Sequence, residues 1–180
     1  LKYAYSSNGS GFIEHDRTTG TEREISIDAL PSPEELWQRY SSNSGLLPEQ
    51  EDIVKQDYHF DSSGKSPRYY QHIAINRTVE AVAKGQNRVL LTMATGTGKT
   101  LVAFHIIHRL WKSKKVGRIL FLADRNILVD QTKRGDFKHF KDKMTVIKKH
   151  KIDKSYEVYL SLYQGIVNYD DDKDAYKEFS

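Results

Sequence analysis

The sequence predicts an α/β fold, in which a parallel sheet covered by helices is preceded by a small α+β N-terminal segment. Three observations support this fold class. Residues 88–112 read as an apolar strand, a glycine-rich loop and an apolar segment with helical spacing. Two further apolar runs, at 118–123 and 157–162, are separated by helix-forming sequence, and such alternation indicates parallel strands with right-handed crossovers. The first 60 residues differ from the rest in composition.

Charge is unevenly distributed along the 180-residue chain, whose net charge is +4. Residues 1–60 hold 11 Asp/Glu against 5 Lys/Arg, whereas residues 61–180 hold 13 against 23. A basic surface favours a polyanionic partner, although solvated lysine faces are a common alternative. The absence of cysteine excludes disulfides and cysteine-ligated zinc. No apolar run approaches the roughly 18 residues of a membrane span, and we expect no signal peptide and no membrane association.

Residues 1–66 are predicted to form a connector segment. Its expected elements are a hairpin of residues 11–14 and 21–27, a helix starting after Ser32, and linkers at 41–47 and 61–67. Ser32 is a typical helix N-cap, with Pro33 in the first helical position and Glu35 able to complete a capping box. No catalytic constellation is found in this segment.

Residues 67–180 are predicted to form the sheet domain. Its expected elements are a helix at 68–84 capped by Gly85, a strand at 88–93, a helix at 99–112, a strand at 118–123, a helix through Leu128 and Gln131, and a strand at 157–162. We expect Ile73, Val79 and Val82 to face inward, and the run at 118–123 to be buried on both faces. In parallel sheets, ligands bind at the carboxyl ends of the strands. We expect the glycine loop, Asp124-Arg125 and Tyr163-Gln164 to lie at these ends.

The segment GTGKT at 96–100 has the composition of a phosphate-binding loop. Gly96 and Gly98 allow the backbone N–H groups to turn toward phosphate oxygens, Lys99 supplies a cation, and the Thr100 hydroxyl is placed to ligate Mg²⁺. The usual pattern begins with a further glycine, and Met93 stands in that position. An ordinary glycine turn with a solvated lysine is the alternative, but it would not need apolar segments on both sides.

Together these motifs resemble superfamily 2 helicases. MATGTGKT at 93–100 is similar to their first motif, Tyr69-Tyr70-Gln71 to their adenine-reading glutamine motif, ILFLADRNILVDQT at 119–132 to motif Ia, and LSLYQG at 160–165 to the motif after it. The combination, with ALPSPEELWQRY at 29–40, looks most like the motor subunit of type I restriction endonucleases. The resemblance implies a RecA-like P-loop NTPase fold, here incomplete, and a bacterial or archaeal cytoplasmic protein.

The resemblance also implies roles for matched residues. ATP would be bound by Arg68, Tyr70, Gln71, Thr95, Gly96, Thr97, Gly98, Lys99 and Thr100. Lys99 and Thr100 would act in catalysis, with Thr100 on Mg²⁺, while Arg125 and Gln164 would face DNA. The implied activity is ATP-driven translocation on double-stranded DNA, and the implied partners are the specificity and methylation subunits. Simpler interpretations remain for two of these residues. Gln71 could be an exposed polar residue, and Arg125 could cap its own helix or pair with Asp124.

Two other groups of polar residues are weaker candidates. His105 and His108 lie three positions apart on the predicted helix, a spacing that can suit a metal. Without a carboxylate at matching spacing, we expect one histidine to be partly buried and the other exposed rather than a metal site. Asp170-Asp171-Asp172 reads as a solvated acidic loop. No apolar strand closing on Asp-Glu is found before Ser180, although ATP hydrolysis requires such an acidic element. We therefore expect these 180 residues alone to bind nucleotide weakly without turning it over.

Three alternative functions share the phosphate loop. The chain could belong to the motor of a type III restriction enzyme or a repair-type helicase. It could instead be a nucleotide-gated module whose basic face binds a protein. A small-molecule kinase fits poorly, because the motifs at 69–71 and 119–125 would have no role in it.

Overall fold

The computed structural model describes residues 2–60, 66–147 and 152–166. The chain divides into two compact units, Leu1–Glu51 and Asp52–Ser180, which we call the N-terminal and C-terminal units. The sequence instead predicts the boundary between the two parts of the chain at residues 66 and 67. In the part of the chain that the structure describes, no helix is long and apolar enough to span a membrane.

The N-terminal unit is an antiparallel sheet followed by a helix. Strands β1 (Tyr3–Ser7), β2 (Gly11–Asp16) and β3 (Thr21–Ser26) pair in that order, and a 3₁₀ turn, η1 (Ile27–Ala29), leads to α1 (Pro33–Ser44). The predicted hairpin is confirmed, with Glu14 opposite Arg23, whereas β1 was not predicted. Tyr5, Arg23 and Arg39 all bond the buried Glu14 carboxylate, which ties the three strands to α1.

Helix α1 begins as the sequence predicts. Ser32 Oγ accepts a bond from Glu35 N at 3.2 Å, and Glu35 Oε2 accepts one from Ser32 N at 2.8 Å, which completes the capping box. The predicted linker at 41–47 is wrong in its first half, because α1 continues to Ser44 and ends at Gly45 with a φ of +63°. Serine and asparagine in that stretch are tolerated because they lie in the last turn. Helix α2 (Pro48–Val54) was also not predicted.

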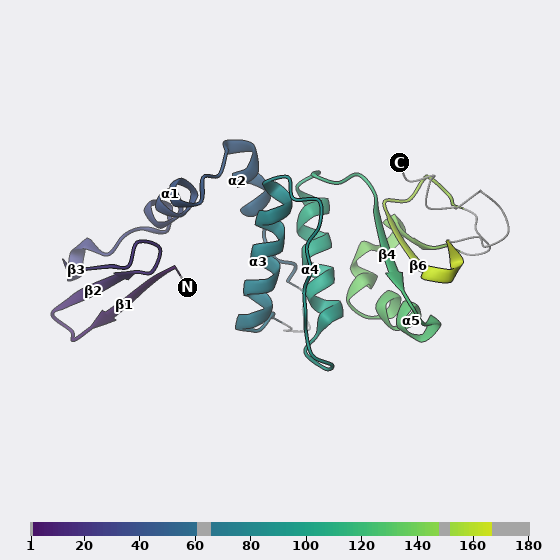
Figure 1. The fold of residues 1–180 in the computed structure, drawn as a ribbon, viewed down its shortest axis with the longest axis horizontal. Coiled ribbons are helices and arrows are strands. Elements are labelled where there is room, and N and C mark those ends of the chain that lie inside the picture. The colour runs from purple at the N-terminus through teal and green to yellow at the C-terminus, as the bar shows by residue number, and fades with distance from the viewer. Residues whose placement is uncertain (1, 61–65, 148–151, 167–180) are drawn as a thin grey trace. The chain divides into compact units, whose positions relative to one another are not determined.

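The C-terminal unit contains a three-stranded parallel sheet beside a pair of helices (Figure 1). Its elements are α3 (Tyr69–Ala83), α4 (Lys99–Lys112), β4 (Ile119–Ala123), α5 (Asn126–Arg134), η2 (Asp136–Lys143), β5 (Met144–Val146), β6 (Val158–Leu162) and η3 (Tyr163–Gly165). The strand order is β4-β6-β5, and both pairings are parallel. The predicted parallel α/β fold, and its helices and strands from α3 onward apart from the strand at 88–93, are confirmed.

Strand β6 lies between two clusters of buried side chains. Val158 and Leu160 pack on one face in a cluster that also contains Phe104, Phe137, Phe140, Met144 and Val129. Tyr159 packs on the other face with Ile147 and Ile166, as the two-residue period of a strand requires. Each fully buried apolar side chain contributes about 1.5–3 kcal/mol to folding. The sheet is therefore stabilised chiefly through its central strand.

Two predictions of burial are wrong. The run at 118–123 forms β4, which is an edge strand and only half-buried, with Leu122 39% exposed; β6 is the strand that is buried on both faces. On α3, Val79 is buried as predicted, but Ile73 is 44% exposed. An apolar run reports a tendency to be buried, whereas its position in the sheet decides how many faces are covered.

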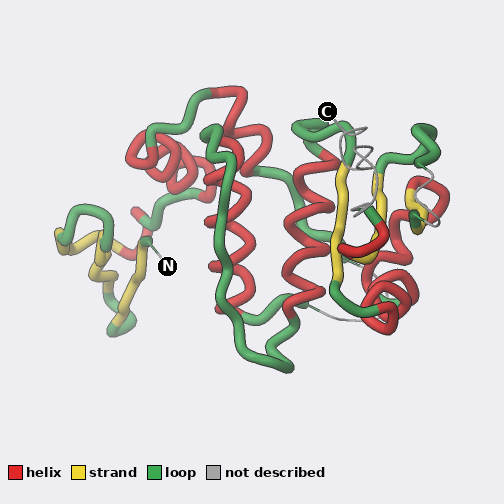
Figure 2. Tube along the Cα trace, turned by 45° about the vertical axis from the view of Figure 1, so that its right-hand side comes forward, coloured by secondary structure: helices red, strands yellow, loops and turns green. Residues whose placement is uncertain are grey.

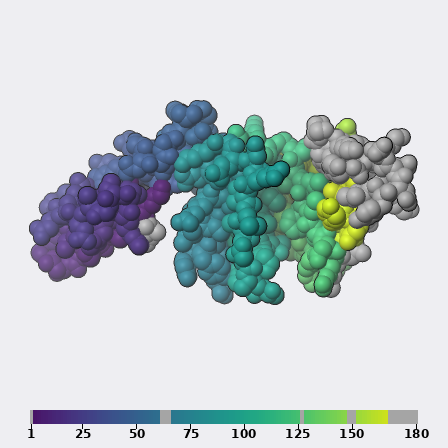
Figure 3. Space-filling model, in the orientation of Figure 1, coloured from purple at the N-terminus to yellow at the C-terminus, as the bar shows by residue number. Residues whose placement is uncertain are grey.

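The predicted strand at 88–93 is also wrong. The segment is a loop that runs alongside α3 and α4 (Figure 2), and it lies at the molecular surface (Figure 3). Leu90 is 89% exposed, and Val89 and Leu91 are 43% and 39% exposed. A strand exists only where a neighbour completes its backbone hydrogen bonds, and none of the described strands pairs with this segment.

Candidate nucleotide-binding site

Both glycines of the glycine loop have a left-handed backbone conformation. Gly96 and Gly98 have φ of +78° and +82°, a region that other residues rarely adopt. No heavy atom lies within 4 Å of a Cβ built on Gly96, so the loop is open there. A Cβ on Gly98 would lie 2.5 Å from Nε2 of Gln71. The left-handed backbone conformation favours glycine at 98, and a Cβ there would also displace the Gln71 side chain.

Lys99 and the start of α4 make the loop suitable for an anion. The Lys99 side chain is held by the loop itself, because its Nζ donates to the carbonyl oxygen of Ala94 at 3.0 Å and that of Met93 at 3.4 Å. Helix α4 starts at Lys99, has no side-chain cap and carries no acidic residue in its first turn. The positive end of the helix dipole therefore faces the loop without compensation from a carboxylate. Thr100, half-buried, follows Lys99 in this turn.

The start of α3 contacts the same loop. Gln71 Nε2 donates to the Thr97 carbonyl oxygen at 2.8 Å, and the Tyr70 hydroxyl donates to the same oxygen at 3.3 Å. Gln71 is 4% exposed, and its Oε1 accepts a bond from the backbone N–H of Arg68 at 2.8 Å. The motifs at 68–71 and 95–100, which are far apart in the sequence, therefore form one continuous site. The interpretation of Gln71 as an exposed polar residue is wrong.

The two residues predicted to face DNA lie at the carboxyl ends of two neighbouring strands. Arg125 follows β4 and Gln164 follows β6, and these neighbouring strands are parallel with Ala123 opposite Leu162. The Arg125 side chain is 77% exposed and lies 3.7 Å from the Asp124 carboxylate, while Gln164 is exposed in η3. Both side chains are accessible to a partner on this side of the unit.

Of the two histidines of α4, His105 is buried and His108 is half-buried, so the expectation that one of them is exposed is wrong. His105 is 1% exposed, and Nδ1 of both His105 and His108 is buried without a hydrogen-bond partner. Burial, reinforced by the nearby His59, lowers the pKa of each to about 4, so both are neutral at pH 7. Among the described residues no cluster of three His, Asp or Glu side chains could hold a metal ion. The acidic run at 170–172 lies outside the described residues.

Sequence reasoning missed Arg109. Arg109 is 3% exposed, and its guanidinium donates from Nη1 to Asn76 Oδ1 of α3 at 2.7 Å and from Nη2 to the Val54 carbonyl oxygen. These bonds explain why residues 52–58 belong to the C-terminal unit. A signal was present, because Val102, His105 and Arg109 share the i, i+3, i+7 spacing of one helix face.

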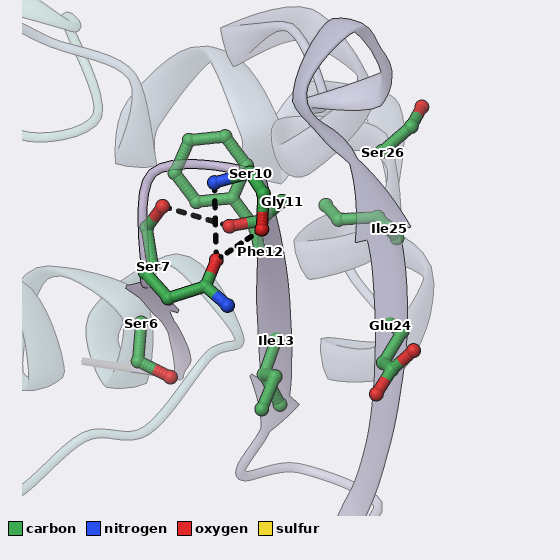
Figure 4. A pocket seen from close by; sticks show the side chains of 10 residues that line it. Ser6, Ser7, Ser10, Gly11, Phe12, Ile13, Glu24, Ile25 and Ser26 are labelled. Carbon is green, nitrogen blue, oxygen red and sulfur yellow. Dashed lines mark hydrogen bonds between the residues drawn. The ribbon is translucent and has the colours of Figure 1, made fainter.

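A pocket in the N-terminal unit does not add a second candidate site. It is formed by the turn between β1 and β2 and by the adjacent face of β3 (Figure 4). Asn8 Oδ1 accepts bonds from both N and Oγ of Ser10, and Ser7 Oγ donates to the Gly11 carbonyl oxygen. These polar groups are occupied in holding the turn, and the remaining lining mixes apolar side chains with Ser6, Glu24 and Ser26.

Comparison with known proteins identifies the family. The family model described as type III restriction enzyme, res subunit, matches residues 64–180. The chain belongs to this family of restriction-enzyme res subunits. The match includes α3, the glycine loop, α4 and the parallel sheet, and so contains every residue of the site described above.

The res-subunit assignment is refined by individual relatives. The chain is 54% identical to the type I restriction enzyme EcoAI endonuclease subunit of Escherichia coli over 99% of its length, and 35% identical to the EcoKI endonuclease subunit of strain K12 over 73%. A solved fragment described as an HsdR subunit of a type I restriction enzyme from Vibrio vulnificus YJ016 superposes with a TM-score of 0.78, at 40% identity over 99% of this chain.

The chain is thus a helicase-like segment similar to the HsdR subunit of type I restriction enzymes. It spans 22% of the EcoAI subunit, 12% of the EcoKI subunit and 31% of the Vibrio fragment. The predicted resemblance to the type I motor subunit and the RecA-like fold class are confirmed.

Proposed function

We propose that this chain forms the ATP-binding part of the DNA translocase motor of a type I restriction enzyme. The observation that supports the proposal is the open loop at 95–100, whose two left-handed glycines, lysine and uncapped helix start come together. This combination suits a triphosphate chain, which needs several N–H donors and a cation in a small volume.

Each residue has a defined task in this proposal. The backbone from Thr95 to Gly98 donates to the phosphates, and Lys99 leaves the Ala94 carbonyl oxygen to pair with them. The Thr100 hydroxyl holds Mg²⁺, which, when bound with ATP, neutralises charge on the phosphate oxygens. Gln71 has a second N–H and a second oxygen lone pair beyond its two bonds, enough to read the adenine edge with Arg68 and Tyr70 nearby.

DNA contact is proposed at the carboxyl end of the sheet, where Arg125 and Gln164 lie. Both side chains are exposed, and they follow the carboxyl ends of the neighbouring strands β4 and β6. The stretch from Lys99 to Lys154 holds 16 Lys/Arg against 5 Asp/Glu. An excess of basic side chains favours binding to the phosphate backbone of double-stranded DNA, a contact that does not read its sequence. Target choice would then come from specificity and methylation subunits, as the relationship to type I enzymes suggests, in the bacterial cytoplasm.

Hydrolysis requires more than this site. Among the described strands none ends in an Asp-Glu pair; β4 leads to Asp124-Arg125 and β6 to Tyr163-Gln164. A carboxylate that orients water and Mg²⁺ is needed for phosphoryl transfer. We therefore expect the 180-residue chain to bind ATP and to release no phosphate in steady state.

The proposal is tested by titrating the chain with a fluorescent ATP analogue in the presence of Mg²⁺. Lys99→Ala removes a charge-assisted contact and should weaken binding roughly 10- to 100-fold. Lys133→Ala, at an exposed lysine of α5, is the matched control and should leave binding unchanged. Equal affinity of the Lys99 variant and the parent chain would contradict the proposal, and steady phosphate release lost on Lys99→Ala would contradict the expected inactivity.

A further inference from the structure

Helices α3 and α4 both contact the glycine loop at their N-terminal ends. Helix α4 starts from the loop at Lys99, and α3 bonds the Thr97 carbonyl oxygen through Tyr70 and Gln71. The two helices pack side by side along their length (Figure 1). A displacement of the loop therefore acts on both helices at the same end.

The same two helices hold the segment Val54–Tyr58, which we call the junction because the chain passes between its two units at residues 51 and 52. From α4, Arg109 donates to the Val54 carbonyl oxygen and lies over the Tyr58 ring at 4.9 Å. From α3, Asn76 Oδ1 accepts the Tyr58 hydroxyl at 2.7 Å. Arg109 follows Lys99 by ten residues, which is about 15 Å along the helix.

Asn76 Oδ1 is shared between the two partners. It accepts bonds from both the Tyr58 hydroxyl and Arg109 Nη1, each at 2.7 Å. The Tyr58 ring is also packed against His72 of α3 and His105 of α4, at centroid distances of 4.7 and 5.4 Å. A shift of α4 along α3 cannot keep all these contacts at their present lengths, because the junction is bonded to both helices at once.

We infer that α3 and α4 couple the state of the glycine loop to the junction, so that filling the loop changes how firmly Val54–Tyr58 is held. The inference builds on the ATP site proposed above but does not need nucleotide for its test. In this arrangement Tyr58, Asn76 and Arg109 are positioning residues, which touch neither the loop nor its ligand. By reciprocity, loosening the junction also changes the loop.

Hydrogen–deuterium exchange of the full chain, followed by mass spectrometry, measures both directions. Tyr58→Phe keeps the ring and removes only the hydroxyl bond to Asn76. In the chain without nucleotide, it should speed exchange of amides at 94–98 by up to about fivefold, the equivalent of one net hydrogen bond. In the parent chain, ATP with Mg²⁺ should slow exchange across residues 52–60 at least twofold.

The control is Lys84→Met, which removes the exposed bond from Lys84 to Glu80 on the same helix at 2.6 Å and should leave the loop unchanged. Amides of α3 and α4 around Val79 and Val102 report whether each variant is folded. Asn76→Ala, which removes both shared bonds, should give a larger effect at 94–98 than Tyr58→Phe.

Faster exchange confined to 52–60 in both junction variants, with residues 94–98 unchanged, would overturn the coupling. So would an equal response of the loop to Lys84→Met. Failure of ATP to bind would count against the proposed function, whereas the comparison of variants without nucleotide would still decide the coupling.

Discussion

The bond between Gln71 and Thr97 leads to a prediction that separates two roles of one side chain. Gln71→Ala removes a 2.8 Å bond from a residue that is 4% exposed. A net hydrogen bond is worth about 0.5–1.5 kcal/mol, and Tyr70 retains its longer bond to the same oxygen. If the bond preorganises the loop, the affinity for any polyphosphate should fall about two- to tenfold, whatever base it carries.

Inorganic tripolyphosphate is the decisive probe because it has no base. Competition titrations against a fluorescent nucleotide, with Mg²⁺ present, compare ATP and tripolyphosphate on Gln71→Ala and on the parent chain. We expect both ligands to be weakened, with an extra loss for ATP if Gln71 also reads adenine. Gln86→Ala, at an exposed glutamine, is the control. Unchanged tripolyphosphate affinity on Gln71→Ala would refute the preorganisation of the loop by this bond.

Three further predictions concern stability and DNA binding. The pKa of His105 and His108 is about 4 in the folded chain and near 6.5 in the unfolded chain. The free energy of unfolding should therefore decrease as the pH is lowered from 6.5 to 4, by up to about 3 kcal/mol for His105. Urea titrations at pH 7.5 and 5 measure this decrease, which should be smaller in His105→Leu. Glu14→Gln leaves two arginines without their carboxylate and should destabilise the N-terminal unit by about 1–3 kcal/mol, seen as faster hydrogen exchange in residues 2–51, whereas unchanged exchange would show that the cluster contributes nothing. Arg125→Ala should weaken binding of unrelated DNA duplexes equally and lower the slope of log affinity against log salt by about 1, and a sequence-dependent loss would contradict a backbone contact.

Local signals in the sequence predicted much of this protein. The capping box at Ser32, the hairpin of β2 and β3, and the bounds of α4 all follow from short-range patterns. Such features depend on neighbouring residues or on a regular period, so they are readable along the chain.

Predictions failed where they depended on distant partners. The run at 88–93 is apolar enough for a strand, but no described strand bonds to it. The runs that form β4 and β6 look alike, yet one is an edge strand and the other is central. Pairing and burial are properties of a neighbourhood, which composition does not specify.

The chemistry of the site was determined by the sequence alone: two glycines, a lysine and a threonine in one short loop have the donors and the flexibility that a polyphosphate requires. Only the tertiary structure decided what surrounds that loop. It placed Gln71 and Tyr70 against Thr97, and it buried Arg109 between Asn76 and Val54. Hydrogen bonds between residues 26 to 55 positions apart arise from helix packing, and no local pattern records them.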